Sequence, residues 1–171
     1  MNDILDVLKE RRSIRSFKDE MPSDSDIERV VEAVLYAANG MNRQLTAFIV
    51  VKDKETRDAL SRVNAEILKS KADPFYNAPV IIAVLTKKGV PTGVEDGSLV
   101  LGNMMNEAYS IGLGSCWIHR CKEAFNTEIG KEILKKFNLE DYEGVGHLAL
   151  GYAKENGVAS PRKENRVFYI K

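Results

Sequence analysis

Apolar residues recur along much of the chain with the spacing of one helix face. After Ser23-Asp24-Ser25-Asp26, a typical helix N-terminus, the apolar positions from Ile27 to Leu35 fall at i, i+3, i+4, i+7 and i+8. This pattern predicts a helix that ends near Asn39-Gly40, because glycine accepts the left-handed backbone that often terminates a helix. Similar spacing predicts further helices at residues 4–8, 60–68, 95–111 and 129–137.

Short apolar runs separate these helices and predict strands. They occupy residues 46–52, 79–86, 112–118 and 144–152, and a final run covers residues 166–170. Strands and helices mix without strict βαβ alternation, so the predicted fold class is α+β, with a central mixed or antiparallel β-sheet sandwiched by helices. The final strand follows a polar stretch, residues 153–165, and could therefore reach away from its own domain.

Composition favours one globular domain. The chain has 171 residues, of which 44% are hydrophobic, so we expect residues 1–171 to share a single core. The longest apolar runs, such as residues 78–85, are too short to span a bilayer, and the acidic residues near the start are unlike a signal peptide. With only two cysteines, a secreted disulfide framework is not indicated. We therefore expect a cytoplasmic protein with no membrane partner.

Charge identifies a candidate anion site. Four cationic side chains stand within eight residues, at Arg11, Arg12, Arg15 and Lys18. Because the formal net charge of the chain is zero, this positive charge is local and its partner should be small. Guanidinium groups match phosphate oxygens in pairs, and Ser13 adds a hydroxyl donor, so the segment suits a phosphate monoester. The alternative is an ordinary solvated basic surface, although a second basic pair, Arg162 and Lys163, favours the anion site.

Two other ligand classes are not predicted. Nucleic acid is not favoured, because the net charge is zero and no aromatic residues alternate with the basic ones. Cys116, His119, Cys121 and His147 could be counted as zinc ligands, but Cys116 falls inside an apolar strand instead of a tight turn. A cysteine in such a strand is usually inert core, so we predict neither a metal site nor a redox thiol.

Four segments, in this order, carry a family resemblance: RRSIRSF (11–17), NGMNRQ (39–44), GNMMNEAYSIGLGSCWI (102–118) and LGYAKENGVASPRKE (150–164). Together they resemble the nitroreductase family, homodimeric FMN flavoproteins that reduce nitro compounds, quinones and related acceptors with a nicotinamide cofactor. The resemblance covers nearly the whole chain. It implies a homodimer with FMN at the subunit interface and a C-terminal arm that adds a strand to the partner's sheet.

The resemblance also implies which residues bind the flavin. It places Arg11, Arg12, Ser13 and Arg15 at the ribityl phosphate and the pyrimidine edge, and it brings Arg162 and Lys163 to the phosphate from the far end of the chain. Trp117, Ile118 and His119 would line the flavin, with a backbone N–H bonded to its N5 atom. Asn39, Asn42 and Gln44 would touch the partner's flavin. Here Ala38-Asn39 replaces the family's usual Pro-Ser and Leu45 a common Pro, so a helix C-cap and turn is the alternative role for these amides.

The implied function is an FMN oxidoreductase that works by a ping-pong mechanism. NAD(P)H would deliver hydride to flavin N5 and leave, and a nitroaromatic, quinone or similar acceptor would then enter the same pocket. The flavin would carry the chemistry, so no catalytic side chain is predicted, and Arg11 or Arg12 would stabilise the negative charge of the reduced flavin. The alternative is a flavin-binding or flavin-sensing protein without turnover. Nothing in the sequence selects the acceptor or distinguishes NADH from NADPH.

Overall fold

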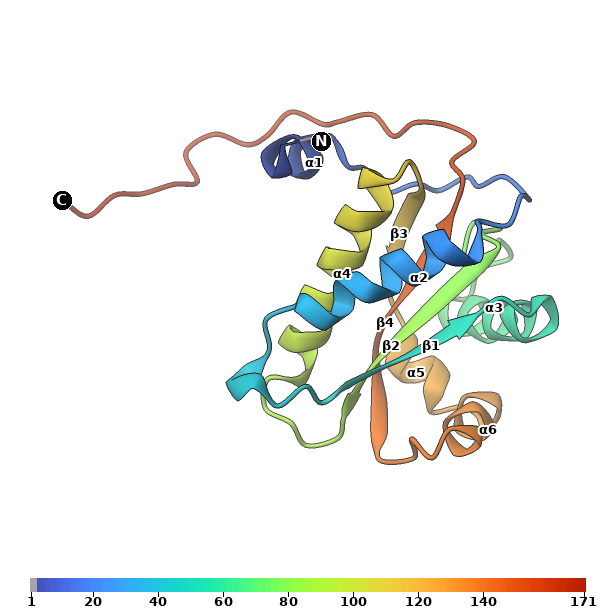
Figure 1. Cartoon of the computed structure of the whole chain (residues 1–171). Helices are drawn as coiled ribbons and strands as arrows, with labels where there is room; N and C mark the ends of the chain where they lie inside the picture. Colours follow the sequence, from blue (N-terminus) through green and yellow to red (C-terminus); the bar gives the residue numbers. More distant parts are fainter. Residues whose placement is uncertain (1–2) are drawn as a thin grey trace.

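The computed structural model describes residues 3–171 and contains one antiparallel sheet in the order β1-β2-β4-β3 (Figure 1). Its strands are β1 (Thr46–Val51), β2 (Val80–Lys87), β3 (Gly114–Ile118) and β4 (Tyr142–Gly151). They coincide with the four internal runs predicted as strands, and every pairing is antiparallel. The α+β class with a central sheet between helices is therefore confirmed.

The central strand β2 explains why its sequence shows no alternation of polar and apolar residues. It lies between β1 and β4, and every residue of β2 except Lys87 is buried. A strand covered on both faces has apolar side chains on both faces. Its residues accordingly divide between two cores, with Ile81 and Leu85 on one side of the sheet and Ile82 and Val84 on the other.

Helices cover both faces of the sheet. One face carries α3 (Lys54–Leu68), α5 (Cys121–Phe125) and α6 (Glu128–Lys136), whose buried residues join the core around Ile81. The other face carries α2 (Asp24–Glu32) and α4 (Gly93–Ser110), which form the core around Ile82. The short helix α1 (Ile4–Glu10) lies against α4 near one end of the sheet (Figure 1). None of the helices within residues 3–171 is long and apolar enough to cross a membrane.

The two edges of the sheet differ. Ser13 and Ile14 lie on the edge at β3, where the backbone N–H of Ile14 donates to the carbonyl of Ser115 at 2.9 Å. At the other edge, β1 pairs with β2 and has no second strand partner in the described part of the chain. An unpaired edge is a natural attachment point for a further strand.

Three features differ from the sequence-based expectation. The helix that begins after Ser23 does not reach Asn39: α2 ends at Glu32 and continues only as a 3-10 turn, η1 (Ala33–Tyr36). Val34 in this turn is buried, which explains why the apolar pattern continues past the end of α2. Leu35 and Tyr36 also fit an apolar run but are exposed. The helix α5 was not predicted, because five residues are too few to show a period.

The predicted strand at residues 166–170 is the third difference. Within this single chain it pairs with nothing and has no regular secondary structure. It carries four apolar side chains that are each at least 70% exposed: Val167, Phe168, Tyr169 and Ile170. The C-terminal segment instead runs past α1 and extends away from the body of the molecule (Figure 1). Within this one chain the segment therefore forms no strand, and its pairing with a partner's sheet stays a prediction.

Candidate functional site

The basic segment, residues 11–15, lies along the outer edge of β3. Ser13 pairs with Ser115 in an isolated parallel bridge, and the buried side chain of Ile14 anchors the segment in the core. Arg15, next in sequence, remains exposed. The basic segment pairs with β3 at Ser115, and the strand ends three residues later, at Ile118. The basic segment and the turn after β3 are therefore connected by this one short strand.

Positive charge gathers at this segment without a carboxylate partner. Burial lowers the pKa of Arg11, and the neighbouring charges of Arg12 and Arg162 lower it further, so residues from both ends of the chain meet here. Among residues 3–171, no ion pair involves the predicted basic site residues Arg11, Arg12, Arg15, Arg162 or Lys163. Like charges held together repel, and an anion between them relieves that repulsion. A phosphate group has the charge and the oxygen geometry for this role.

Arg12 also has a structural role that was not predicted. Its Nη1 donates to the carbonyl oxygens of Lys9 (2.6 Å) and Arg11 (2.7 Å), which are left unpaired at the end of α1. Arg12 therefore caps this helix and has only its remaining N–H groups for a ligand. The Arg11 side chain does not cap the helix, and its Nη1 lies 4.0 Å from the sulfur of Met105 on α4.

The C-terminal segment folds back over the basic segment. The backbone N–H of Lys154 donates to the carbonyl of Ser16 (2.9 Å), and Phe17 pairs with Ala153. Further along, Gly157 approaches so closely that an added Cβ would lie 2.6 Å from Cβ of Arg12. Between the two segments lies a cavity of about 460 Å³. Its lining residues are Glu10, Arg11, Arg12, Ile14, Tyr109, Gly112, Leu113, Gly114, Ser115, Ala153, Asn156, Gly157 and Ala159. Arg11 and Arg12 line it, and Arg162 follows on the same exposed segment.

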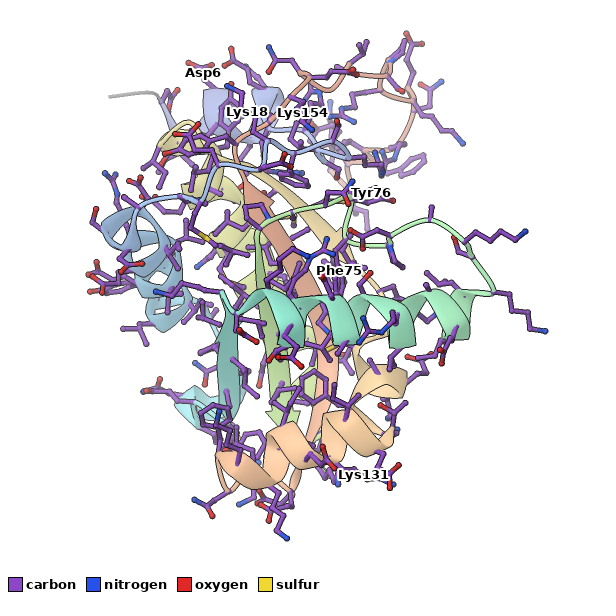
Figure 2. All side chains as sticks on the ribbon, turned by 90° about the vertical axis from the view of Figure 1, so that its right-hand side faces the viewer. Asp6, Lys18, Phe75, Tyr76, Lys131 and Lys154 are labelled. Atoms are coloured by element: carbon purple, nitrogen blue, oxygen red, sulfur yellow. The ribbon has the colours of Figure 1, made fainter. Side chains whose placement is uncertain are left out.

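The turn after β3 forms a second cavity, of about 250 Å³, together with the loop that follows α3. Trp117 is half-buried there, Ile118 is buried and His119 is exposed. The backbone turns at Arg120, which has a left-handed conformation (φ 73°) and precedes α5. The opposite wall includes Tyr76, which Figure 2 shows beside Phe75 above α3.

Asn64 holds this turn in place and was not predicted as a site residue. It is fully buried on α3, and its Nδ2 donates to the carbonyl of His119 at 3.3 Å. A signal was available in the sequence, because Asn64 stands four residues after Leu60, on the buried face of a helix where an apolar residue is expected. A polar residue at such a position usually has a specific partner.

The amides at residues 39–44 bond mainly to each other. The Asn39 side chain accepts from the backbone N–H of Gln44 (2.9 Å), and the Gln44 side chain donates to Asn42 (3.1 Å). Asn42 and Gln44 have left-handed backbones and exposed side chains. Asp96 on α4 anchors the loop by accepting from the N–H of Gly40 (2.9 Å). Asn39 thus takes part in a turn, but it is no helix C-cap, because α2 ends at Glu32 and η1 at Tyr36. Its contact with a flavin stays a prediction. The loop lies at the opposite end of α4 from α1 (Figure 1).

The cysteines and histidines do not assemble as metal ligands. Within residues 3–171, no three His, Cys, Asp or Glu side chains group as ligands would. Cys116 and Cys121 are both buried free thiols, and burial raises the pKa of each. Cys116 lies on the face of the sheet opposite Trp117, because successive side chains of a strand alternate between its two faces. Ser13 and Arg15 lie near its sulfur and partly offset the effect of burial, which places Cys116 beneath the basic segment.

Comparison with known proteins relates this arrangement to one family. The nitroreductase family profile matches residues 8–152. A protein of Archaeoglobus fulgidus with the provisional name NADH dehydrogenase/NAD(P)H nitroreductase is 31% identical over 121 residues, covering 69% of this chain and 68% of that protein. The FMN reductase [NAD(P)H] of Bacillus subtilis is 25% identical over 180 residues, covering 95% of this chain and 70% of that protein.

The fold has solved counterparts. A nitroreductase with bound FMN from Desulfitobacterium hafniense superposes with a TM-score of 0.89 at 27% identity, and the match covers 100% of both chains. The family-profile match and this structural match both span the basic segment, the sheet and the turn after β3. The chain belongs to the nitroreductase family.

Proposed function

We propose that this chain binds FMN and catalyses the NAD(P)H-dependent reduction of small acceptors, such as nitroaromatics or quinones, by a ping-pong mechanism. One observation carries the proposal: Arg11, Arg12 and Arg162 gather without a carboxylate partner beside a cavity of about 460 Å³. These donors suit a phosphate monoester, so the residues present fit FMN. The relatives named for FMN and NAD(P)H support the same cofactors.

The protein's contribution is to bind and orient the cofactor. Arg11, Arg162 and the Ser13 hydroxyl hold the phosphate, with Arg15 and Lys163 at the exposed rim. Trp117, Ile118 and His119 lie against the flavin ring, and Asn64 fixes the peptide of His119 through its carbonyl. FMN, when bound, supplies the transfer of hydride at its N5 atom. Arg12, which is not assigned to the phosphate here, would favour the more negative, reduced form of the cofactor through its positive charge.

The decisive experiment is the absorption spectrum of the purified protein, followed by anaerobic addition of NAD(P)H. The proposal predicts a yellow protein that bleaches on reduction and recovers its colour with a quinone. A yellow protein that NADH and NADPH both fail to bleach would be a flavin-binding protein without turnover. A colourless protein that cannot be loaded with FMN would refute the proposal altogether.

A first mutational prediction concerns the phosphate contact. Arg11→Ala or Arg162→Ala should weaken FMN binding by about 1.5–3 kcal/mol, roughly 10- to 150-fold, because each removes a charge-assisted hydrogen bond to the phosphate. Riboflavin, which lacks the phosphate, should lose much less affinity. Arg62→Ala, at an exposed arginine on α3, is the control. Equal weakening of both flavins, measured by fluorescence titration, would place the arginines elsewhere than at the phosphate.

We also propose that the working protein is a homodimer in which the C-terminal segment of each chain binds the other. Beside the unpaired edge of β1 runs an apolar groove of about 500 Å³, lined by Ile27, Val31, Leu35, Phe48 and Val50 among others. The four exposed apolar residues from Val167 to Ile170 have the length and character of a strand that fits this edge. A second groove between α1, α2 and α4, lined by Ile4, Leu8 and Tyr36, adds apolar surface that a second copy can cover.

The proposed dimer also gives the loop at residues 39–44 a role. This loop lies away from the basic segment of its own chain (Figure 1), so its exposed Asn42 and Gln44 reach a flavin only in the partner subunit. The hydrogen bonds within the loop would then present these amides in a fixed arrangement.

A further inference from the structure

The loop at residues 39–44 has a backbone conformation that its own residues do not favour. Met41, Asn42 and Gln44 have left-handed backbones, with φ of 56°, 52° and 52°, and this conformation is costly for residues other than glycine. All three side chains are exposed, so packing in the core of this chain does not offset the cost. Strained backbone of this kind clusters at functional sites, where the surrounding structure holds it in place.

Asp96, in the first turn of α4, anchors this loop from outside. Its side chain is buried, and its two carboxylate oxygens have different partners. Oδ1 accepts from the backbone N–H of Gly40 at 2.9 Å, and Oδ2 accepts from the Thr92 hydroxyl at 3.0 Å. Among residues 3–171, no ion pair involves Asp96. The two hydrogen bonds and the positive end of the α4 dipole therefore offset the cost of burying its charge.

Gly40 packs closely against the same anchor. A Cβ added to Gly40 would clash with the side chain of Thr92, so the loop requires glycine where it meets α4. A larger residue at position 40 would push the loop away from Asp96. The start of the loop is therefore fixed by Asp96 and Thr92, while the hydrogen bond between Asn39 and Gln44 (2.9 Å) closes it.

The anchored loop and the basic segment lie at opposite ends of α4 (Figure 1). This helix has 18 residues and is therefore about 27 Å long. Near its C-terminal end, Tyr109 donates to Glu10 (2.9 Å) and Met105 lies beside Arg11. One helix thus holds the basic segment near one end and the loop at the other. The loop does not contribute to the phosphate site of its own chain.

We infer that Asp96 is a positioning residue for cofactor binding in the partner subunit. The inference rests on the proposed function, in which Asn42 and Gln44 of each chain reach the flavin of the other. By holding Gly40, Asp96 fixes where these two amides stand. Loss of its carboxylate therefore weakens flavin binding in the other chain and leaves the site of its own chain intact. Because neutral amides carry no charge to match a phosphate, they serve the uncharged part of the cofactor.

The first test measures the loop itself, in the full-length protein as purified. Asp96→Ala should speed hydrogen exchange at the Gly40 N–H about tenfold, because this group loses its acceptor. Asp96→Asn keeps an acceptor oxygen and should exchange nearly as the wild type does. Glu95→Ala removes an exposed carboxylate from the same helical turn and is the control. Equal exchange in Asp96→Ala and Glu95→Ala would overturn the anchoring role.

The second test measures flavin affinity by fluorescence titration. Asp96→Ala should weaken FMN and riboflavin equally, by about tenfold, which corresponds to the loss of one or two neutral hydrogen bonds. Asp96→Asn and Glu95→Ala should bind both flavins as the wild type does. Gly40→Ala displaces the loop without changing Asp96, so it should match Asp96→Ala and replaces that variant if it does not fold. A loss confined to FMN would mean that Asp96 acts on the phosphate site, and the inference would be wrong.

Mixed dimers, purified through a different affinity tag on each chain, identify the subunit whose flavin Asp96 serves. In the first, one chain carries Arg11→Ala and the other carries Asp96→Ala. The chain with Asp96→Ala keeps its own Arg11 and receives an intact loop, so one site should bind FMN as tightly as the wild type and the other much more weakly. In the second, one chain carries both substitutions and its partner is wild type, and neither site should have wild-type affinity. If Asp96 acts within its own subunit, the two mixed dimers give the reverse result, which refutes the inference.

Failure of the proposed function gives a different pattern. A wild-type protein that takes up neither FMN nor riboflavin refutes both the function and the inference, even where Asp96→Ala frees the loop. A wild-type protein that binds FMN as a monomer refutes the proposed dimer and the inference with it. If the wild type is a dimer that binds FMN, but Asp96→Ala binds it as tightly as Glu95→Ala does, the inference alone is refuted.

Discussion

Burial changes the acid–base chemistry of His147 strongly. It is fully buried on β4, and its ring lies 5.2 Å from the ring of Phe75 and 6.0 Å from that of Phe125, measured between centroids. Within residues 3–171, neither ring nitrogen has a hydrogen-bond partner. Burial lowers the pKa of His147 to about 3, so the side chain is neutral at pH 7.

This shift predicts a specific dependence of stability on pH. The pKa of a histidine in the unfolded chain is about 6.5, so as the pH falls the unfolded state binds a proton first. Stability is therefore unaffected above about pH 7 and is lost progressively below pH 6.5. At pH 5 the loss from this one group is about 2 kcal/mol, from 1.4 kcal/mol for each pH unit below 6.5. Urea unfolding at pH 7.5 and pH 5 should show this loss in the wild type.

His147→Leu is the matched variant for that prediction, because leucine fills a similar volume and cannot be protonated. The difference in unfolding free energy between pH 7.5 and pH 5 should be about 2 kcal/mol smaller in the variant. An identical difference in both proteins would mean that His147 is protonated in the folded state at pH 5.

Single residues show where sequence-based reasoning succeeds and where it stops. Composition and spacing predicted the basic segment, because four cations in a neutral chain stand out in the sequence alone. The helix-capping role of Arg12 was not predictable, since the carbonyls that it bonds become unpaired only where α1 ends. The contact between Asn64 and His119 was also missed, because it joins residues 55 positions apart.

Among the secondary-structure elements, those with a long apolar period were the predictable ones. The N-cap at Ser23 is confirmed, with its side-chain oxygen accepting from the N–H of Asp26 at 3.1 Å. The four strands of the sheet were predicted because apolar, often β-branched runs bounded by turns are typical of buried strands. The loop at residues 69–77 had no such signal, since its conformation depends on Asp73 bonding to Arg57 and Ser61 on α3.

The network around Asp73 carries a prediction for this loop. Asp73→Asn should lower the free energy of unfolding by about 2 kcal/mol at pH 7, because it weakens several hydrogen bonds and leaves Arg57 partly unpaired in a buried position. Hydrogen exchange at residues 69–77 should become faster. Because the folded-state pKa of Asp73 is lowered, its contribution is present above about pH 4, and the difference between wild type and variant should shrink below that pH.

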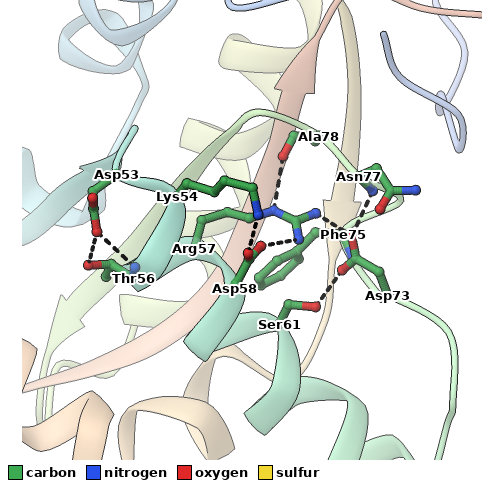
Figure 3. Close-up of polar contacts among 10 residues, drawn as sticks. All are labelled: Asp53, Lys54, Thr56, Arg57, Asp58, Ser61, Asp73, Phe75, Asn77 and Ala78. Carbon is green, nitrogen blue, oxygen red and sulfur yellow. Dashed lines mark hydrogen bonds and ion pairs between the residues drawn. The ribbon is translucent and has the colours of Figure 1, made fainter. Parts of the chain in front are cut away.

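Asp58→Asn provides the control for Asp73→Asn. Asp58 pairs with the same Arg57 at 3.0 Å, but its side chain is 32% exposed and lies on the outer side of α3 (Figure 3). Its removal should cost less than about 1 kcal/mol. Equal losses in the two variants would show that the loop does not depend on Asp73.

At the scale of the whole molecule, the C-terminal segment cannot be understood from one chain. Residues 166–170 have the composition of a strand, yet every residue from Lys154 to Lys171 is exposed. Soluble proteins rarely leave so many apolar side chains uncovered. The strand prediction is correct only if the segment pairs with another subunit. The open edge of the sheet is at β1, and β3, beside which the basic segment lies, is at the other edge.

A chain that ends at Asn165 tests this arrangement. It keeps Arg162 and Lys163 but lacks the apolar residues that we propose to pair with β1 of the partner. Because each subunit of a twofold dimer donates one segment, the dimer loses this contact twice. We expect the shortened chain to dissociate at higher concentration and to release FMN more readily, since Arg162 is then no longer held over the basic segment. Sedimentation with detection at the flavin absorbance measures both effects, and removal of Lys171 alone is the control.

If the chain ending at Asn165 stays dimeric and retains its flavin on dilution as well as this control does, the segment plays no part in the interface, and the groove between α1, α2 and α4 must supply the dimer contact.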